Sequence, residues 1–211
     1  MFFMAAPATQ DVERSRPVDV RISAPHEPAR VLIADDEVLL GHALSMSFRA
    51  LNYSVVGLAR NGEEALSLVR AHRPDVVTMD VRMPACDGLE ATRRIMAEQP
   101  TCIVMLTAFS GYQEAAKDAG AMGYAVKPLF PAHIPALVES ARRRFARYME
   151  IRSTQPSPEA ALQTWLVVQA AVGSICQSGR SEDESAAALQ QSAEAAGISL
   201  LDAALRVVDK N

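Results

Sequence analysis

Hydrophobic and polar positions between residues 30 and 150 follow two patterns that alternate along the chain. Short runs rich in Val, Ile, Leu, Met and Thr are typical of buried strands, and longer segments with apolar residues at helical spacing predict amphipathic helices. Five strands that alternate with five helices favour an α/β fold with a doubly wound parallel sheet and helices on both faces. The strands are predicted over 30–37, 54–59, 75–80, 101–108 and 123–128, and the helices over 37–53, 61–74, 87–100, 111–121 and 133–150.

The end of the sequence predicts a second, all-helical unit. The segment 151–158 is polar, contains two prolines and indicates a linker. Apolar spacing after it predicts a small bundle of three helices, the first over 158–177. Residues with the chemistry of helix caps mark the ends of these helices. They are Ser181 with Glu184, Ser199 with Asp202, and Gly179 and Gly197 in the breaks.

These patterns divide the chain into four parts. Residues 1–29 contain four prolines, scattered charge and no sustained periodicity, which predicts a flexible extension. The other parts are an α/β domain over 30–150, the linker over 151–158 and a three-helix domain over 159–211.

Composition narrows the class of protein only slightly. The chain is 49% hydrophobic and 22% charged with a net charge of −4, which is ordinary for a globular protein and gives no general argument for nucleic acid or membrane binding. Cys86, Cys102 and Cys176 have neither metal-binding nor disulfide spacing. The N-terminal segment is a poor signal peptide, and no segment is long and apolar enough to span a bilayer. We therefore expect a cytoplasmic protein with reduced thiols and no membrane partner.

Polar side chains stand at the ends of four predicted strands. Asp35 and Asp36 follow the first strand, Asp80 ends the third, Thr107 the fourth and Lys127 the fifth. The carboxyl ends of parallel strands form the ligand crevice of such sheets. Three carboxylates at one edge repel one another unless a cation joins them, and Mg²⁺ prefers such oxygen ligands. A carboxylate beside the metal can attack phosphorus, while a hydroxyl and an amine stabilise the transferred group. The sequence therefore predicts self-phosphorylation of Asp80 with Mg²⁺.

Four motifs in order resemble the response-regulator receiver domain. They are ADDE after the first strand, MDVRMPACDGLE after the third, TA after the fourth and GYAVKP at the fifth, within about 30–147. The resemblance implies a flavodoxin-like strand order 2-1-3-4-5, Asp80 as phosphoacceptor and a cognate histidine kinase as partner. It also implies homodimerisation upon phosphorylation, through the face built by helix four, strand five and helix five. It implies no catalysis beyond the domain's own phosphorylation and dephosphorylation.

The same resemblance assigns roles within the acidic site. Asp35 and Asp36 form the acidic pair around Mg²⁺, which Asp80 also binds. Arg82 gives its backbone carbonyl to the metal. An aspartate pair after a strand is also a common helix N-cap, so the sequence leaves open that Asp35 and Asp36 cap the next helix as well.

The phosphoryl group and the switch involve residues of the last two strands. By resemblance, Thr107 bonds a phosphoryl oxygen and Lys127 pairs with the phosphate. Tyr124 is similar to the family's switch aromatic, which turns inward when Thr107 is drawn to the phosphate. The bond between Lys127 and Pro128 matches one that the family holds cis.

The segment over about 163–208 resembles the ANTAR domain, a three-helix RNA-binding module of transcription antiterminators. The match lies in Ala171 and Gly173 of the first helix, the SEDES opening of the second and the final LLDAALRVV helix. It implies binding of an RNA stem-loop, with candidate contacts at Ala171, Gly173 and Arg180. Val172 departs from the family, which commonly has lysine there.

Charge leaves a second output class open. From residue 159 onward the sequence has three cations against seven acids, whereas RNA binding draws much of its affinity from phosphate neutralisation. A bundle that binds a partner protein, without RNA, is therefore the alternative. A DNA-binding output is disfavoured because no helix has the basic character of a recognition helix.

Two other features are interpreted as structural. Trp165 is expected in the core or in an interface rather than as a stacking platform for bases. The basic run of the fifth predicted helix is expected to be a solvated helix face rather than a binding patch. It consists of Arg142, Arg143, Arg144, Arg147 and Arg152.

Overall fold

The computed structural model describes residues 27–209, so most of the extension predicted over 1–29 lies outside the described residues, as does Lys210. A five-stranded parallel sheet in the order β2-β1-β3-β4-β5 forms the centre of an α/β domain. This confirms the predicted doubly wound, flavodoxin-like order. The strands are β1 Arg30–Ala34, β2 Ser54–Ala59, β3 Val76–Met79, β4 Cys102–Thr107 and β5 Gly123–Val126.

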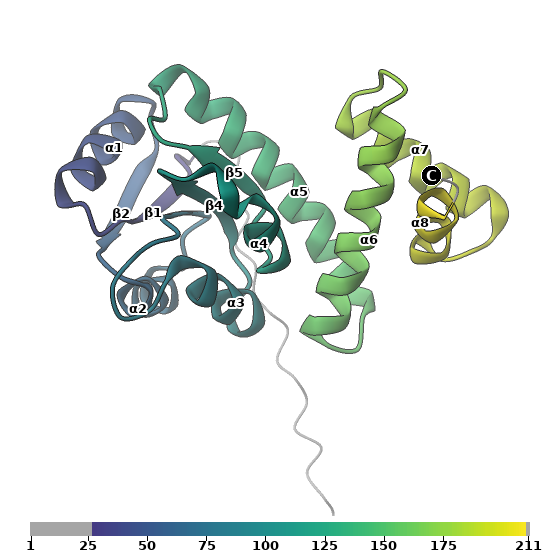
Figure 1. The fold of residues 1–211 in the computed structure, drawn as a ribbon, viewed down its shortest axis with the longest axis horizontal. Helices are drawn as coiled ribbons and strands as arrows, with labels where there is room; N and C mark the ends of the chain where they lie inside the picture. The colour runs from purple at the N-terminus through teal and green to yellow at the C-terminus, as the bar shows by residue number, and fades with distance from the viewer. Residues whose placement is uncertain (1–26, 210–211) are drawn as a thin grey trace, which may run out of the picture.

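Helices cover both faces of the sheet, and three more helices follow at one side (Figure 1). In the described part of the chain, no helix is both long and apolar enough to cross a membrane. The helix predicted over 111–121 is shorter than expected, because a 3₁₀ turn at Ser110–Tyr112 precedes it. The helices are α1 Val38–Ala50, α2 Gly62–His72, α3 Gly88–Glu98, α4 Gln113–Asp118, α5 Ile134–Thr154, α6 Pro158–Cys176, α7 Glu182–Ala196 and α8 Leu200–Val208, with a second 3₁₀ turn at Pro131–His133.

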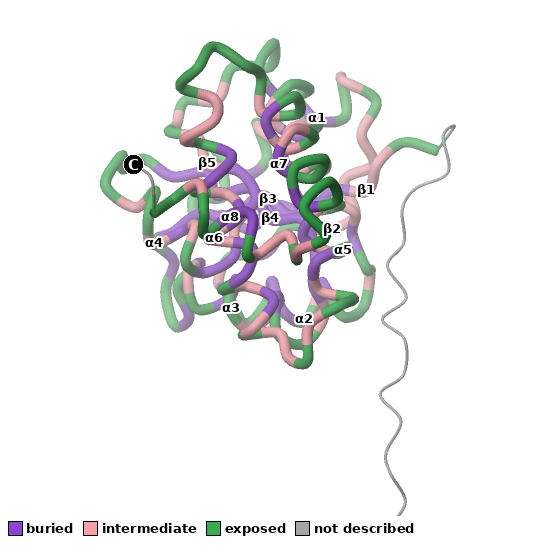
Figure 2. Tube along the Cα trace, turned by 90° about the vertical axis from the view of Figure 1, so that its right-hand side faces the viewer, coloured by how far each residue is buried: buried purple, intermediate pink, exposed green. Residues whose placement is uncertain are grey.

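The central strands are buried on both faces. Every residue of β3 and β4 is buried, and their traces lie in the purple interior in Figure 2. Because helices lie on both sides of a parallel sheet, such strands read as continuous apolar runs rather than as an alternation. A polar side chain at the end of such a strand is therefore held in position by a rigid frame.

The caps predicted for the last helices are present. Ser181 and Glu184 form a reciprocal capping box at the start of α7, and Ser199 accepts a hydrogen bond from the Asp202 amide at the start of α8. Gly197 ends α7 with a φ of 62°, in the left-handed region where glycine has no steric penalty. Local chemistry thus sets where the C-terminal helices begin and end.

The connection between the α/β domain and the C-terminal helices differs from the prediction. α5 continues to Thr154, so residues 151–154 of the predicted linker are helical and only 155–157 separate α5 from α6. Trp165 of α6 is 2% exposed and packs edge-on against Tyr148 of α5, with ring centroids 6.1 Å apart. α6 therefore packs against α5 through an apolar seam that includes this aromatic pair, and Figure 1 shows the two helices side by side, with α7 and α8 beyond α6.

The interpretation of the basic run as a solvated face is wrong for three of its five arginines. Arg143, Arg144 and Arg147 form ion pairs with Glu182 and Asp183 at the start of α7. These ion pairs connect α5 to the start of α7, because α7 lies within reach once α6 packs beside α5.

Candidate functional site

The sheet register brings the predicted polar residues to one edge. Ala34, which precedes Asp35, pairs with Met79, which precedes Asp80, so the carboxylates leave two neighbouring strands at the same level. Thr107 is the last residue of β4 and pairs with Val126, directly before Lys127. Strands β1, β3, β4 and β5 are neighbours in this order, and their carboxyl ends therefore form one continuous site.

Three carboxylates meet at this edge, joined by a lysine. Ligand oxygens of Asp35, Asp36 and Asp80 all lie within 4.8 Å of one another. Asp35 and Asp80 are each 6% exposed, whereas Asp36 faces solvent. The Lys127 Nζ lies 2.6 Å from Asp80 Oδ2 and 2.8 Å from Asp35 Oδ2. The two buried carboxylates, Asp35 and Asp80, are thus partly neutralised by one amine, while the third, Asp36, remains accessible.

The protonation of Lys127 follows from the same contacts. Burial by itself lowers the pKa of the Lys127 amine, but the hydrogen bonds and charges of Asp35 and Asp80 outweigh burial, so that its pKa is raised above the ordinary value. The amine therefore stays a cation at neutral pH. A fixed positive charge at this position suits a site in which negative charge is transferred.

Phe109 connects Thr107 to Tyr124. The Thr107 side chain is fully buried, and its hydroxyl accepts a hydrogen bond from the Phe109 amide at 3.4 Å. The Tyr124 hydroxyl donates to the Phe109 carbonyl. The Arg82 guanidinium lies over the Phe109 ring, 4.3 Å from its centroid. Sequence reasoning missed Phe109, because nothing in a single aromatic after a strand indicates that three site residues meet there.

The loop after β3 is held close to Asp80. The Arg82 amide donates to Asp80 Oδ1 at 3.4 Å, and the Gly88 amide donates to the Val81 carbonyl at 2.9 Å. A Cβ at Gly88 would lie 1.9 Å from the Asp80 carbonyl oxygen, so no larger residue fits without a backbone shift. The glycine belongs to the motif that follows the third strand, but its role in this close approach follows only from the structure.

The chemistry of the donor set fits Mg²⁺. Oxygen ligands from Asp35, Asp36 and Asp80 suit a hard cation that binds through a few carboxylates and keeps several waters. The exposure of Asp36 leaves the cluster open to solvent on one side. The peptide bond between Lys127 and Pro128 is cis, as expected.

The three residues suggested for RNA contact do not form one surface. Ala171 is fully buried within the core, so its methyl group cannot contact RNA, and this assignment is corrected. Val172, at the position where ANTAR domains commonly have lysine, is also buried. Gly173 and Arg180 are exposed. A helical residue that matches a family pattern can serve packing alone, and the sequence did not separate the two roles.

Comparison with known proteins identifies the α/β domain. A family model described as the response regulator receiver domain matches residues 31–139, just over half of the chain. The chain belongs to the response regulator receiver family. It is thus a receiver of a two-component system.

Similar proteins extend the receiver in different ways. The transcriptional regulatory protein PdtaR of Mycobacterium tuberculosis is 40% identical over 148 residues, which is 69% of this chain and 72% of that protein. A protein-glutamate methylesterase/protein-glutamine glutaminase of Haloarcula marismortui is 46% identical over 103 residues, or 47% of this chain and 28% of that protein. Receivers of one fold therefore accompany different outputs, and the output must be argued from the C-terminal helices.

A solved structure matches the receiver with a similar sequence. In the CheX-CheY-BeF3-Mg complex from Borrelia burgdorferi, the matched chain is 31% identical with a TM-score of 0.52. The match covers 54% of this chain and 89% of that chain. The part of this receiver protein that follows α5 is outside the family model.

Proposed function

We propose that Asp80 accepts a phosphoryl group from a histidine kinase or a small acyl phosphate, and that phosphorylation controls an RNA-binding output formed with α6, α7 and α8. One observation carries the proposal: Asp35, Asp36 and Asp80 converge with Lys127 at the carboxyl edge of the sheet. This arrangement joins a nucleophile, oxygen ligands for a cation and a fixed positive charge in one accessible site.

The transfer is a displacement at phosphorus. A carboxylate oxygen of Asp80 forms a bond to phosphorus, while the bond to the donor's histidine nitrogen or acyl oxygen breaks and its electron pair leaves with the donor. Lys127, hydrogen-bonded to Asp80 at 2.6 Å, is placed to neutralise charge that moves from the carboxylate to the phosphoryl oxygens. When bound, Mg²⁺ supplies further positive charge to these oxygens.

Phosphorylation then changes the hydrogen bonds at Phe109. The Thr107 hydroxyl, now an acceptor for the Phe109 amide, donates to a phosphoryl oxygen of Asp80 and draws the β4–α4 loop toward it. Because Tyr124 is tied to the carbonyl of the same Phe109, the loop movement frees Tyr124 to turn inward. This shifts an equilibrium between two arrangements of the loop rather than creating a new one.

Tyr124 lies at the junction with α6. It lines a cavity of about 360 Å³ together with Arg144, Trp165 and Gln169. The Gln169 Nε2 is buried and has no hydrogen-bond partner among the described residues, which makes this part of the junction costly to keep closed. Since α6 packs against α4 and α5, it must move before a second receiver can dock on that face. Homodimerisation upon phosphorylation would therefore follow release of α6.

Two observations support RNA as the output partner over DNA. The C-terminal helices resemble the ANTAR module in Gly173, the SEDES opening of α7 and the final LLDAALRVV helix. No helix from residue 159 onward has the basic character of a DNA recognition helix. The alternative is an output that binds a protein and no RNA, favoured by the acidic charge of the same helices.

RNA capture from a cell lysate separates these alternatives. The bait is the full chain with and without beryllofluoride and Mg²⁺, and Asp80→Asn serves as the matched control. We expect short stem-loops to be enriched by the beryllofluoride state and not by the control, since only the former carries a phosphoryl mimic. If protein that binds beryllofluoride enriches no RNA in either state, the output is a protein contact instead.

A prediction for the kinase follows from the surface of α1. Leu39 and Met46 lie seven residues apart on one helical face and are 84% and 72% exposed, and the helix that carries them begins shortly after the acidic pair. We propose this face as the kinase contact. The double variant Leu39→Asn, Met46→Asn is expected to slow phosphotransfer from the histidine kinase by about tenfold or more, because exposed apolar patches mark protein–protein contacts and their burial contributes to affinity.

The small-molecule reaction provides the internal control for this prediction. Phosphorylation by acetyl phosphate should be unchanged in the same variant, as α1 makes no contact with so small a donor. Leu205→Asn on α8, a similar change at an exposed residue, should leave both rates unchanged. Transfer from the kinase at the wild-type rate would show that the kinase docks elsewhere.

A further inference from the structure

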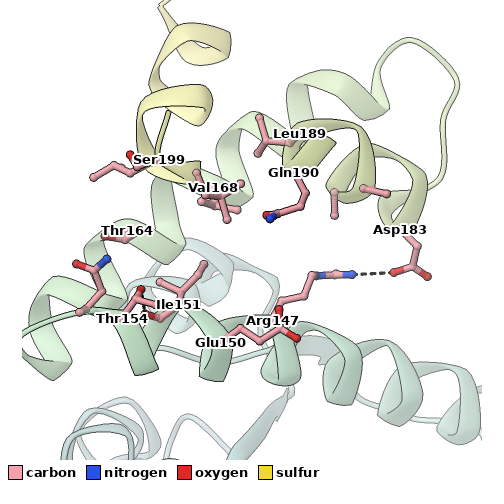
Figure 3. A pocket seen from close by; sticks show the side chains of 15 residues that line it. Arg147, Glu150, Ile151, Thr154, Thr164, Val168, Asp183, Leu189, Gln190 and Ser199 are labelled. Atoms are coloured by element: carbon pink, nitrogen blue, oxygen red, sulfur yellow. Dashed lines mark hydrogen bonds and ion pairs between the residues drawn. The ribbon is translucent and has the colours of Figure 1, made fainter. Parts of the chain in front are cut away.

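The three paired arginines of α5 meet two acids at the start of α7. Arg144 contacts Glu182 with Nε and Nη2, at 2.9 Å and 2.7 Å. Arg147 reaches both acids, with Nη2 2.7 Å from Glu182 and Nη1 2.8 Å from Asp183. The Arg143 Nε lies 3.2 Å from Asp183. These three side chains are called the α5 arginine face below, and Figure 3 shows Arg147 directed at Asp183.

The acids occupy positions that phosphate oxygens can also take. Arginine binds carboxylates and phosphates in the same bidentate geometry, with two parallel N–H donors. Glu182 receives such a pair of donors from Arg144 and a further one from Arg147, as a phosphate between two arginines would. An anionic backbone with successive phosphates therefore fits the α5 arginine face once α7 leaves it.

The contact between α7 and α5 is poorly packed and replaceable. A cavity of about 740 Å³ lies between α5 and α7 and also reaches α6 and α8, with Ile151, Val168 and Leu189 in its lining (Figure 3). The arginine side chains of the ion pairs are a quarter to a half exposed, and exposed pairs contribute little stability. The Arg147 Nε is buried without a hydrogen-bond partner in the part of the chain that the structure describes. A ligand that offers this donor an acceptor gains from the exchange.

We propose that the α5 arginine face is the phosphate-binding surface for RNA, and that Glu182 and Asp183 cover it as an internal competitor in the resting chain. The inference rests on the RNA-binding output proposed above and locates its electrostatic part on the receiver's last helix. It accounts for an RNA partner in a chain whose residues from 159 onward carry only three cations, because the cations come from α5.

The arginine face is also connected to the switch. Arg144 donates through Nη1 to the Met122 carbonyl at 3.0 Å, directly before β5, and lines the same cavity as Tyr124. A change at Tyr124 therefore alters the surroundings of an arginine that holds Glu182. Phosphorylation of Asp80 uncovers the α5 arginine face by weakening the contact between Arg144 and Glu182.

Two variants disturb the contact between α5 and α7 from opposite sides: one removes its two acids and the other removes two of its three arginines. Glu182→Gln with Asp183→Asn removes the acids and leaves all arginines, while Ser181 and Glu184 still cap α7. Arg143→Gln with Arg147→Gln weakens the contact from the other side, by removing both pairs to Asp183 and one to Glu182. It keeps Arg144, which the receiver needs at the Met122 carbonyl. The matched control is Arg93→Gln with Arg94→Gln, an equal change of charge at exposed ion pairs of α3.

Binding of a fluorescein-labelled RNA hairpin is measured by anisotropy over a series of KCl concentrations. Without beryllofluoride, the acid variant should bind on the order of tenfold more tightly than the wild type, because its competitor is gone. The arginine variant should bind weakly with or without beryllofluoride. For the arginine variant, the slope of log affinity against log salt should be shallower by about 1.5 than for the acid variant, because two phosphate contacts are lost. The α3 control should match the wild type.

The outcomes separate this inference from the proposed function. If the acid and arginine variants both bind the hairpin more tightly than the wild type, the RNA surface lies on the released helices, so the RNA-binding output stands and the α5 face is excluded. An equal loss in the α3 control would show a general charge effect and overturn the inference. If no chain binds in either state, while thermal melting shows every variant folded, the RNA-binding output itself fails.

Discussion

Replacing Asp80 with Asn is expected to abolish phosphorylation of the chain by acetyl phosphate and Mg²⁺. The amide has no anionic oxygen to attack phosphorus, and the substitution also removes one of the two carboxylates that hold Lys127. Loss of an attacking group typically lowers a rate by on the order of 10³-fold or more. Intact-mass spectrometry over a time course would show the mass of one added phosphoryl group in the wild type and none in the variant.

The control for this prediction is Asp118→Asn, an equal change at an exposed carboxylate on α4. It should be phosphorylated at the wild-type rate. The alternative acceptors are Asp35 and Asp36, which lie in the same cluster. Phosphorylation of the Asp80→Asn chain at an undiminished rate would move the nucleophile to one of them and contradict the assignment.

Replacing Trp165 with Ala is expected to lower the free energy of unfolding by about 3–5 kcal/mol, the usual cost of truncating a large buried aromatic residue. Trp165 is 2% exposed and packs against Tyr148 at the junction of α5 and α6. The cavities on both sides of the junction provide little packing that could compensate. The loss should fall on the C-terminal helices, so that the receiver stays folded and still accepts a phosphoryl group.

Urea unfolding followed by circular dichroism measures this effect. The matched control is Leu39→Ala, since Leu39 is apolar but 84% exposed, and its truncation should change stability by no more than about 0.5 kcal/mol. A loss below about 1 kcal/mol for Trp165→Ala would mean that the α5–α6 seam contributes little and that the C-terminal helices are held in another way.

The sheet and its acidic edge follow from the sequence because their signals are local. Apolar runs such as that of β4, alternating with helical segments, are typical of a parallel sheet covered on both faces, and the residue after each run then lies at the carboxyl edge. Asp35, Asp80 and Lys127 could therefore be placed together from their positions after such runs. The helix caps at Ser181 and Ser199 follow from equally local chemistry.

Contacts between distant segments could not be predicted in the same way. An arginine run on a helix has the same sequence pattern whether water or another helix covers it. The partners of Arg144 and Arg147 lie more than thirty residues away, and they come within reach only because α6 packs beside α5. Ala171 failed as an RNA contact for a similar reason, because its side chain is used in packing.

Phe109 was overlooked because its importance is in its backbone. Its amide and carbonyl hold Thr107 and Tyr124, while its ring lies under Arg82. Backbone amides and carbonyls are common to almost every residue type, so the residue type at position 109 does not indicate these hydrogen bonds. The link from Thr107 through Phe109 to Tyr124 is therefore a property of the folded chain that the sequence pattern does not indicate.

Hydrogen–deuterium exchange of the full chain, with and without beryllofluoride and Mg²⁺, tests most directly whether Asp80 controls the C-terminal helices. We predict that amides of α6 and of the first turn of α7 exchange faster in the beryllofluoride state, while the loop after β3 becomes protected, and that Asp80→Asn shows neither change. Protection of that loop with unchanged exchange in α6 and α7 would contradict this prediction, because the site would be occupied without any effect on the output helices.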